Sequence, residues 1–285
     1  MPGRLMAGAF GDVVTTLFPG DCRLCGGPLL SLREALVCTA CRARAGRQQQ
    51  GLLCGVCGEA LGVEGEQAWR QFGASGQVPL CTPCRRVRPA FSRAVAWGLY
   101  EEELRELIQG LKYAPDMEKA SAVLGPLLAE AMLLLEPETA TEVVVVSVPL
   151  AHGRRRERGF NQVDRLLRAA LPVVARRAPQ WRLAVEPGVL VRQRETESQW
   201  GLTPRERRRN VRGAFTVAQP VAVRGREVML VDDIYTTGAT ARECAAVLLA
   251  AGAAKVWVAT LSRAQEDRAA LWQGDDAEIA MWGSG

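Results

Sequence analysis

Hydrophobic positions after residue 90 follow two periods in turn, one typical of strands and one typical of helices. Apolar runs at 91–100, 142–150, 226–231 and 255–262 predict strands, and the second run has the continuous apolar character of a strand buried on both faces. Stretches with helical spacing separate these runs, at 101–113, 117–135, 161–176 and 241–252, with a further short helix that Thr203 caps before Pro204. Strands that alternate with helices predict a doubly wound, mostly parallel α/β sheet.

The apolar segments also bear on where the protein works. Gly, Pro and Asp interrupt residues 1–21, so no secretory signal is recognisable there. The longest apolar segment, 122–135, carries Pro126 and Glu130 and falls short of the roughly 18 apolar residues that a membrane-spanning helix needs. We therefore expect a core helix, no transmembrane segment and a cytoplasmic protein, with peripheral association at the inner face of the cell membrane left open.

The positive charge comes almost wholly from arginine. The net charge is +5, and only three of the 36 basic residues are lysine. Arginines far outnumber acids between His152 and Arg212, where Phe160 and Trp200 are interspersed. Clustered arginine with aromatic side chains is how single-stranded nucleic acid is held without sequence readout, although the same charge could serve a phosphate ligand. Because His152 is the single histidine, a mechanism that needs several imidazoles is excluded.

Eight of the nine cysteines lie before residue 85 and form four Cys-x-x-Cys pairs. The pairs belong to an internal repeat, in which CRLCGGPL at 22 matches CGVCGEAL at 54 and LVCTACR at 36 matches PLCTPCR at 79. Each pair can ligate one metal from a tight turn, and two pairs complete a tetrahedral sulfur site that favours zinc. We expect two structural zinc ions held by Cys22, Cys25, Cys38, Cys41, Cys54, Cys57, Cys81 and Cys84.

The repeat favours one zinc per repeat, although a cross-braced pairing of first with third and second with fourth stays open. Disulfides fit poorly with a cytosolic chain, and a redox site needs one Cys-x-x-Cys rather than four. The last Cys-x-x-Cys pair ends just before Arg85. This predicts a zinc-binding domain at 1–90 and an α/β domain at 91–285. The ninth cysteine, Cys244, falls in a predicted helix and is expected to be a small buried side chain.

The sequence VMLVDDIYTTGAT at 228–240 carries the clearest chemistry. A buried strand would place Asp232 and Asp233 at its carboxyl end, where ligands bind in such sheets. Carboxylates there can accept hydrogen bonds from the vicinal hydroxyls of a ribose. The following TTGAT leads into a helix whose N–H groups favour a phosphate, with Gly238 allowing close approach. The pattern therefore predicts a ribose 5-phosphate site.

This segment resembles the 5-phosphoribosyl 1-pyrophosphate (PRPP) signature of type I phosphoribosyltransferases. Further motifs make the whole chain similar to the competence protein F (ComF) family, which pairs an N-terminal cysteine region with a phosphoribosyltransferase-like domain. In order, these are the four Cys-x-x-Cys pairs, LKY at 111–113, VSVPL at 146–150, RGFNQ at 158–162, R-x-x-x-T-x-x-Q at 192–199, and R-x-x-N at 207–210 with GAF after it.

The resemblance implies a role for each matching residue. Asp232 and Asp233 would bind the ribose hydroxyls and form the catalytic pair, holding the ring rather than transferring protons. The 5-phosphate would lie on Thr236, Thr237, Gly238, Ala239 and Thr240. The pyrophosphate loop would be the turn at Val148, Pro149 and Leu150, with Arg158 and Lys112 as candidates for diphosphate charge and magnesium arriving with PRPP. Residues 192–210 would take the place of the mobile loop that covers the site.

Two classes of function stay open at this point. The resemblance implies a PRPP-binding protein of natural transformation that acts in the uptake of single-stranded DNA with other DNA-uptake proteins. The alternative is an active phosphoribosyltransferase, a pentosyltransferase of nucleobase salvage or nucleotide metabolism. No residue pattern selects an acceptor base, so the sequence leaves catalysis undecided.

Overall fold

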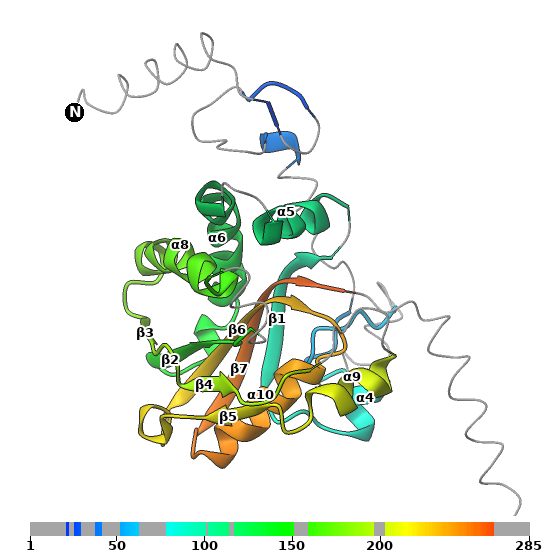
Figure 1. Cartoon of the computed structure of the whole chain (residues 1–285), viewed down its shortest axis with the longest axis vertical. Helices are drawn as coiled ribbons and strands as arrows, with labels where there is room; N and C mark the ends of the chain where they lie inside the picture. The colour runs from blue at the N-terminus through cyan, green and yellow to red at the C-terminus, as the bar shows by residue number, and fades with distance from the viewer. Residues whose placement is uncertain are drawn as a thin grey trace, which may run out of the picture.

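The structure, a computed structural model, describes residues 21–22, 26–29, 38–41, 52–62, 78–100, 102–113, 117–150, 159–196 and 203–264. Within these residues a five-stranded sheet forms the centre of the chain (Figure 1). All four neighbouring strand pairs are parallel. The strand order is β1 (Arg93–Leu99), β7 (Lys255–Arg263), β6 (Glu227–Tyr235), β2 (Glu142–Ser147) and β3 (Arg182–Val185).

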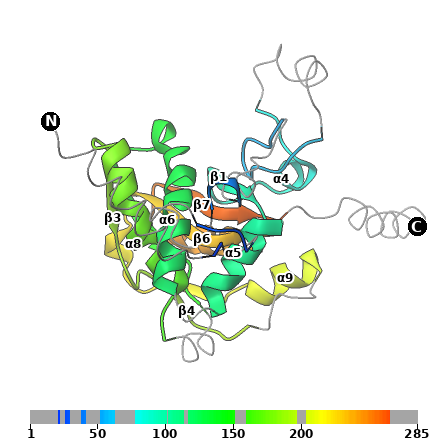
Figure 2. The same ribbon diagram turned by 90° about the horizontal axis from the view of Figure 1, so that it is seen from above.

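Helices cover both faces of this sheet, which confirms the predicted doubly wound α/β class. Three helices lie over one face, as Figures 1 and 2 show: α5 (Glu102–Tyr113), α6 (Met117–Leu133) and α8 (Gln162–Arg177). The opposite face carries α10 (Ala239–Ala250), α9 (Pro204–Val211) and an antiparallel pair of short strands, β4 (Leu190–Arg192) and β5 (Phe215–Val217). Two 3-10 turns, Glu136–Glu138 and Pro220–Ala222, and the short helix α4 (Thr82–Arg86) lie outside these two layers.

Alternate residues of the central strands feed two separate hydrophobic cores, because successive side chains of a strand point to opposite faces. The core under α6 and α8 takes Val143, Val145, Met229, Val231, Trp257 and Ala259. The core under α10 takes Val144, Val146, Val228, Leu230, Val256 and Val258. Strands with both faces buried read as continuous apolar runs, which is why β2 and β6 were recognisable from sequence.

The long apolar helix α6 belongs to the core. By length and composition alone the stretch Ala120–Glu138 could cross a membrane, with a mean hydropathy of 1.4, but 61% of that window is buried within the protein. Leu124, Leu128 and Met132 are fully buried against the sheet. Gly125 lies so close to α8 that a Cβ there would overlap Ala169. The expectation of a core helix is therefore confirmed, with Pro126 accommodated inside it.

Two predicted strands have other bounds in the structure, and one strand of the sheet was not predicted. The strand expected at 226–231 continues to Tyr235, because Asp232, Ile234 and Tyr235 keep pairing with β7. The strand expected at 142–150 ends at Ser147. The edge strand β3 was not predicted, since its side chains are exposed or only half-buried and show no apolar run.

Candidate functional site

The chain reverses its direction across the sheet between β2 and β6. From β2 the chain passes through α8 to β3 on one side, and from β6 it passes through α10 to β7 on the other. The two strands are direct neighbours, with Ser147 opposite Val231. Their carboxyl ends thus flank the switch point at which open α/β sheets bind ligands.

The acid pair lies at this switch point, but deeper than the sequence suggested. Asp233 is 7% exposed, and its carboxylate accepts a hydrogen bond of 3.0 Å from the Gln162 amide nitrogen at the start of α8. Asp232 is half-buried, and its Oδ1 accepts from the Asp233 backbone N–H at 2.8 Å. Asp233 is therefore buried, whereas Asp232 remains partly exposed.

The two carboxylates face different helices. Asp233 meets α8 through Gln162. Asp232 lies on the side of α10, where burial first and then the charge of Asp232 raise the pKa of the Cys244 thiol. Cys244 is fully buried, as expected from the sequence. The acid pair thus spans the sheet, with one carboxylate toward each helical layer.

The loop after β6 is built around Gly238. This residue is the N-cap of α10 and has a left-handed backbone with a φ of 72°. A Cβ there would also overlap the hydroxyl of Tyr235, so both conformation and space require glycine. The Thr237 hydroxyl accepts a hydrogen bond from the Ala239 N–H, while Thr236 and Thr240 are half-buried. The loop joins a strand end to a helix N-terminus, where N–H groups and the helix dipole favour an anion.

The turn after β2 is fixed by two hydrogen bonds to the backbone of Val148. The Val148 N–H donates to the Val231 carbonyl at 2.9 Å, and the Val148 carbonyl accepts from the Asn161 side-chain amide at 2.9 Å. Pro149 and Leu150 are half-buried and line a cavity of about 360 Å³ together with the segment between β3 and β4, strand β4 and the start of α8. The turn expected to hold diphosphate is therefore held beside the acid pair.

Sequence reasoning missed the structural role of the first turn of α8. Asn161 caps the helix by accepting from the Val163 N–H, and Gln162 binds Asp233. Asp164 accepts a hydrogen bond of 2.6 Å from the Ser147 hydroxyl at the end of β2. These three side chains join the ends of both switch-point strands. Asn161 and Gln162 belong to the RGFNQ motif, of which the resemblance assigns only Arg158 to the PRPP site.

Several predicted site residues fall outside this picture. Arg158 and Cys25 lie outside the described residues, as do residues 151–158 and 197–202. Lys112 lies in α5, where the side chain is not described. The base of the predicted covering segment is visible, since Arg194 donates to the carbonyls of Asn210 and Arg212 at 2.8 and 2.9 Å. Glu243 of α10 accepts from the Gly213 N–H at 2.6 Å, which ties this base to the helix after the loop.

The cysteines gather into two groups that follow the sequence repeat. The sulfur atoms of Cys54, Cys57, Cys81 and Cys84 all lie within 4.8 Å of one another, and those of Cys22, Cys38 and Cys41 do likewise. First and second pairs therefore share one group and third and fourth pairs the other, so the cross-braced arrangement is wrong. None of the described cysteines forms a disulfide.

The two knuckles are structural copies. The Gly26 N–H donates to the Cys22 carbonyl at 2.8 Å, and the Gly58 N–H donates to the Cys54 carbonyl at 2.8 Å. Both glycines have a left-handed φ, 68° and 73°. The glycine after each second cysteine thus relieves the turn, as the sequence predicted.

The four-cysteine group fits a tetrahedral metal ion. Zinc–sulfur bonds of about 2.3 Å place sulfur atoms roughly 3.8 Å apart, and Cys57 and Cys81 have their sulfurs 3.5 Å apart. Hydrogen bonding from Cys57 lowers the pKa of Cys54, whereas the hydrogen bond to Cys54 raises the pKa of Cys84. Because a thiol must lose its proton to become a ligand, metal binding would release protons from this group.

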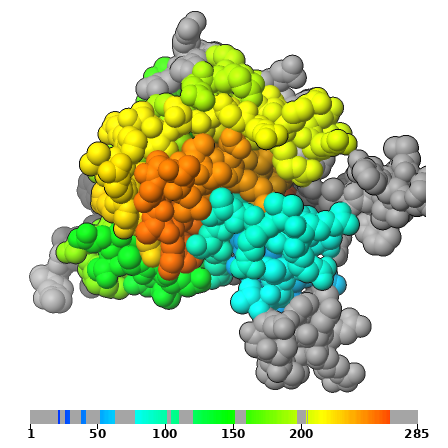
Figure 3. Space-filling model, turned by 90° about the horizontal axis from the view of Figure 1, so that it is seen from below, coloured from blue at the N-terminus to red at the C-terminus, as the bar shows by residue number. Residues whose placement is uncertain are grey.

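The four-cysteine group also forms part of the second hydrophobic core. Its cysteines are at most 7% exposed and share that core with Phe91, Ala94 and Val258. Figure 3 shows the chain around α4 lying directly against α10. This group is thus packed against the sheet domain, whereas the three-cysteine group packs with Leu29 and Val123 of α6.

Comparison with known proteins identifies relatives over most of the chain. No protein-family model matches it. The chain is 35% identical over 247 residues to DNA utilization protein YhgH of Escherichia coli K12, covering 86% of this chain and 97% of the relative. YhgH of Salmonella typhimurium matches to the same extent. Competence protein F of Haemophilus influenzae is 28% identical over 85% of this chain and 96% of its own length.

Two solved structures of larger proteins show weaker likeness. The allosteric regulatory enzyme of purine biosynthesis has a TM-score of 0.30 and 20% identity over 48% of this chain. Glutamine PRPP amidotransferase from B. subtilis has a TM-score of 0.28 and 26% identity over 50%. This chain covers 26% of each of those two chains, so the relationship rests on the sequence relatives. By its near full-length identity to them, the chain belongs to the family of DNA utilization protein YhgH and competence protein F.

Proposed function

We propose that the chain binds PRPP between the carboxyl ends of β2 and β6. The observation that carries this proposal is the meeting of an acid pair and an anion-type loop at the switch point of the sheet. Asp232 and Asp233 lie near the carboxyl end of β6, and the loop that follows this strand turns at Gly238 into α10. Few ligands combine a vicinal diol with a phosphate two sugar carbons away, and ribose 5-phosphate is one of them.

The proposed pose assigns each part of the ligand to one element. The ribose hydroxyls donate to Asp232 and Asp233. The 5-phosphate lies on Thr236–Thr240 at the positive end of the α10 dipole. The diphosphate lies toward the turn at 148–150, with Lys112 and Arg158 as its counter-charges.

A transfer reaction at this site would displace pyrophosphate from the anomeric carbon of the sugar. Magnesium, arriving with PRPP, would offset the negative charge that gathers on the leaving diphosphate. The protein's part would be to hold the ring through the acid pair and to keep water away with the segment at 192–210.

We also propose that the biological role is in the uptake or use of single-stranded DNA. The relatives are named for DNA utilization and competence. On this chain α9 and its end present Arg205, Arg208, Arg209 and Arg212 to solvent beside a single acid, Glu206. We place the work in the cytoplasm, with DNA-uptake proteins as partners and peripheral contact with the membrane as an option.

Phe160 and Trp200 are the aromatic side chains on which a base could stack, and the structure limits how Phe160 can do so. Arg165 lies over the Phe160 ring, with its guanidinium carbon 4.3 Å from the ring centroid. One face of Phe160 is therefore already occupied, and a base would have to use the other face. Trp200 lies outside the described residues, so its proposed stacking role rests on the sequence.

The test is a titration with magnesium-PRPP, followed by a panel of nucleobases assayed for pyrophosphate release. Binding together with release for one base would make the chain a phosphoribosyltransferase. Binding without release for any base would favour a ligand-binding site that serves DNA uptake. Absence of PRPP binding would overturn the proposal.

A further inference from the structure

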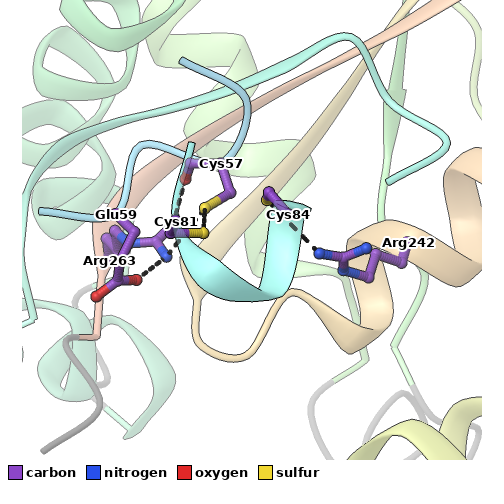
Figure 4. A network of polar contacts seen from close by, with 6 residues as sticks. All are labelled: Cys57, Glu59, Cys81, Cys84, Arg242 and Arg263. Carbon is purple, nitrogen blue, oxygen red and sulfur yellow. Dashed lines mark hydrogen bonds and ion pairs between the residues drawn. The ribbon is translucent and has the colours of Figure 1, made fainter. Parts of the chain in front are cut away.

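Two arginines of the sheet domain reach the four-cysteine group, as Figure 4 shows. Arg263, at the end of β7, donates to the Cys57 carbonyl and has its Nη2 3.8 Å from the Cys57 sulfur. Arg242, in the first turns of α10, has its Nη2 3.7 Å from the Cys84 sulfur and donates to the Val87 carbonyl at 2.9 Å. One arginine thus contacts a sulfur of each Cys-x-x-Cys pair.

The charge of a filled metal site explains why cations gather there. A divalent ion with four thiolates carries two net negative charges, and a buried charge needs nearby partners. Arg263 is only 4% exposed and Arg242 is half-buried, so both supply charge where water does not. Glu59 pairs with Arg263 and orients it, as carboxylates orient the ligands of metal sites elsewhere.

Arg263 also contacts Tyr235, the residue directly before the loop that we assign to phosphate. Its guanidinium carbon lies 4.5 Å from the centroid of the Tyr235 ring. Tyr235 is 5% exposed, and Phe91 packs edge-on against it at 6.3 Å between centroids. The Tyr235 hydroxyl occupies the space beside Gly238 into which a Cβ would project. A continuous series of contacts therefore runs from Cys57 through Arg263 and Tyr235 to Gly238.

A second series reaches the same glycine independently. The backbone N–H of Arg242 donates to the Gly238 carbonyl at 2.9 Å, while its side chain contacts Cys84. The first turn of α10 is thereby fixed at one end by the loop glycine and at the other by the cysteine group. Both series meet at the one residue of the loop with a left-handed backbone.

We propose that Arg263, Arg242 and Tyr235 are positioning residues that make the shape of the loop at Thr236–Thr240 depend on the metal in the four-cysteine group. The proposal rests on the proposed PRPP site for its consequence, but the coupling itself concerns only metal and loop. Loss of this metal would release both arginines from the thiolates, loosen the loop and weaken phosphate binding. The four-cysteine group would then support the ligand site as well as the fold.

The first test measures metal release and loop protection in the zinc-loaded full-length chain. Arg263→Gln and Arg242→Gln should each release zinc to a chromogenic chelator about tenfold or more faster than the parent, in line with other metal-site supports. Amides of 236–240 should exchange hydrogen faster in both variants. Arg177→Gln, at an exposed position in the last turn of α8, is the matched control and should change neither.

Tyr235→Phe separates the contacts of the series. It keeps the ring under Arg263 but removes the hydroxyl beside Gly238, so zinc release should stay at the parental rate while amides 236–240 exchange faster. This variant, together with Arg242→Gln, keeps the proposal testable if the buried Arg263→Gln chain does not fold. Parental zinc release and parental loop exchange in Arg242→Gln would overturn the proposal.

Magnesium-PRPP titration separates the two proposals. If the parent chain binds PRPP, Arg242→Gln and Tyr235→Phe should bind about tenfold or more weakly, and unchanged affinity in both would count against the positioning role. If the parent chain does not bind PRPP, the proposed function fails, while zinc release and amide exchange still decide whether metal and loop are coupled.

Discussion

The Gln162 side-chain amide lies 3.0 Å from the carboxylate of Asp233, joining the first turn of α8 to the end of β6. Gln162 and Asp233 are 71 positions apart in sequence, so the fold, rather than a local motif, brings them together. Because of this contact, the two acids differ in burial and in the roles we assign to them. Asp233 is buried and accepts a hydrogen bond from Gln162, whereas the Asp232 side chain is partly exposed to solvent.

The two acids should therefore respond differently to substitution. Asp232→Asn should abolish PRPP binding and leave the free energy of unfolding within about 0.5 kcal/mol of the parent, as for other sites away from the core. Asp233→Ala should also lower the free energy of unfolding by about 1–3 kcal/mol, because Gln162 loses its buried acceptor. Denaturant unfolding measures both. Equal stability of the two variants would contradict the assigned burial.

Replacement of the loop glycine should be costly for two reasons. Gly238→Ala forces a Cβ onto the Tyr235 hydroxyl in a left-handed backbone, so we expect a loss of about 1–3 kcal/mol in the free energy of unfolding and no PRPP binding. Gly225→Ala is the control, since its φ is 69° but nothing lies within 4 Å of the added Cβ. The control should cost about 1 kcal/mol from backbone strain alone and retain binding. An equal loss of unfolding free energy in both variants would show that the Tyr235 hydroxyl does not restrict the space at Gly238.

Elemental analysis of chain purified without added metal should find about two zinc ions per chain. Binding should weaken as the pH falls, because the thiols must lose their protons to become ligands. A competition titration with a chelator at several pH values measures this dependence. Iron instead of zinc, or disulfides without metal, would contradict the assignment.

The two cysteine groups should differ in what they stabilise. Cys22→Ser should unfold the N-terminal segment and largely spare the sheet domain. Cys57→Ser should lower the melting temperature of the sheet domain too, because Cys57 is buried in its second core and contacts Arg263. Thermal unfolding followed by circular dichroism compares them, and an identical effect of both would argue against the docked position of the second group.

Single-stranded DNA should bind weakly and without strong sequence preference. Replacing Arg205, Arg208 and Arg209 by Ala should lower the magnitude of the log-affinity slope against log salt by about 2, at roughly 0.7 per lost phosphate contact. The same number of exposed arginines replaced elsewhere, at Arg176, Arg177 and Arg182, is the control for net charge. Equal slopes in both triple variants would exclude α9 as the contact surface.

The sequence was most informative where local patterns carry the structure. The cap of α9 is one case, since Thr203 accepts from the Glu206 N–H and Glu206 reaches back to the Thr203 N–H at 2.8 Å. The paired knuckles are another, because each glycine sits in the same position of its repeat. The continuous apolar runs of β2 and β6 are a third.

Features that depend on distant partners were not predictable in this way. The burial of Asp233 is set by Gln162, and the end of β6 is set by pairing with β7. Arg263 contacts Cys57 across 206 positions of sequence, so no local sequence pattern around either residue predicts the contact. The edge strand β3 has the half-exposed side chains of an outer strand and gives no periodic signal.

The most direct test of the central claim is calorimetric titration of magnesium-PRPP into the parent chain and into Asp232→Asn, with Arg177→Gln as the control. We predict one PRPP bound per chain in the parent and in Arg177→Gln, and no detectable binding in Asp232→Asn at unchanged stability. Absence of binding in the parent, or equal affinity in Asp232→Asn, would contradict a ribose phosphate site between β2 and β6.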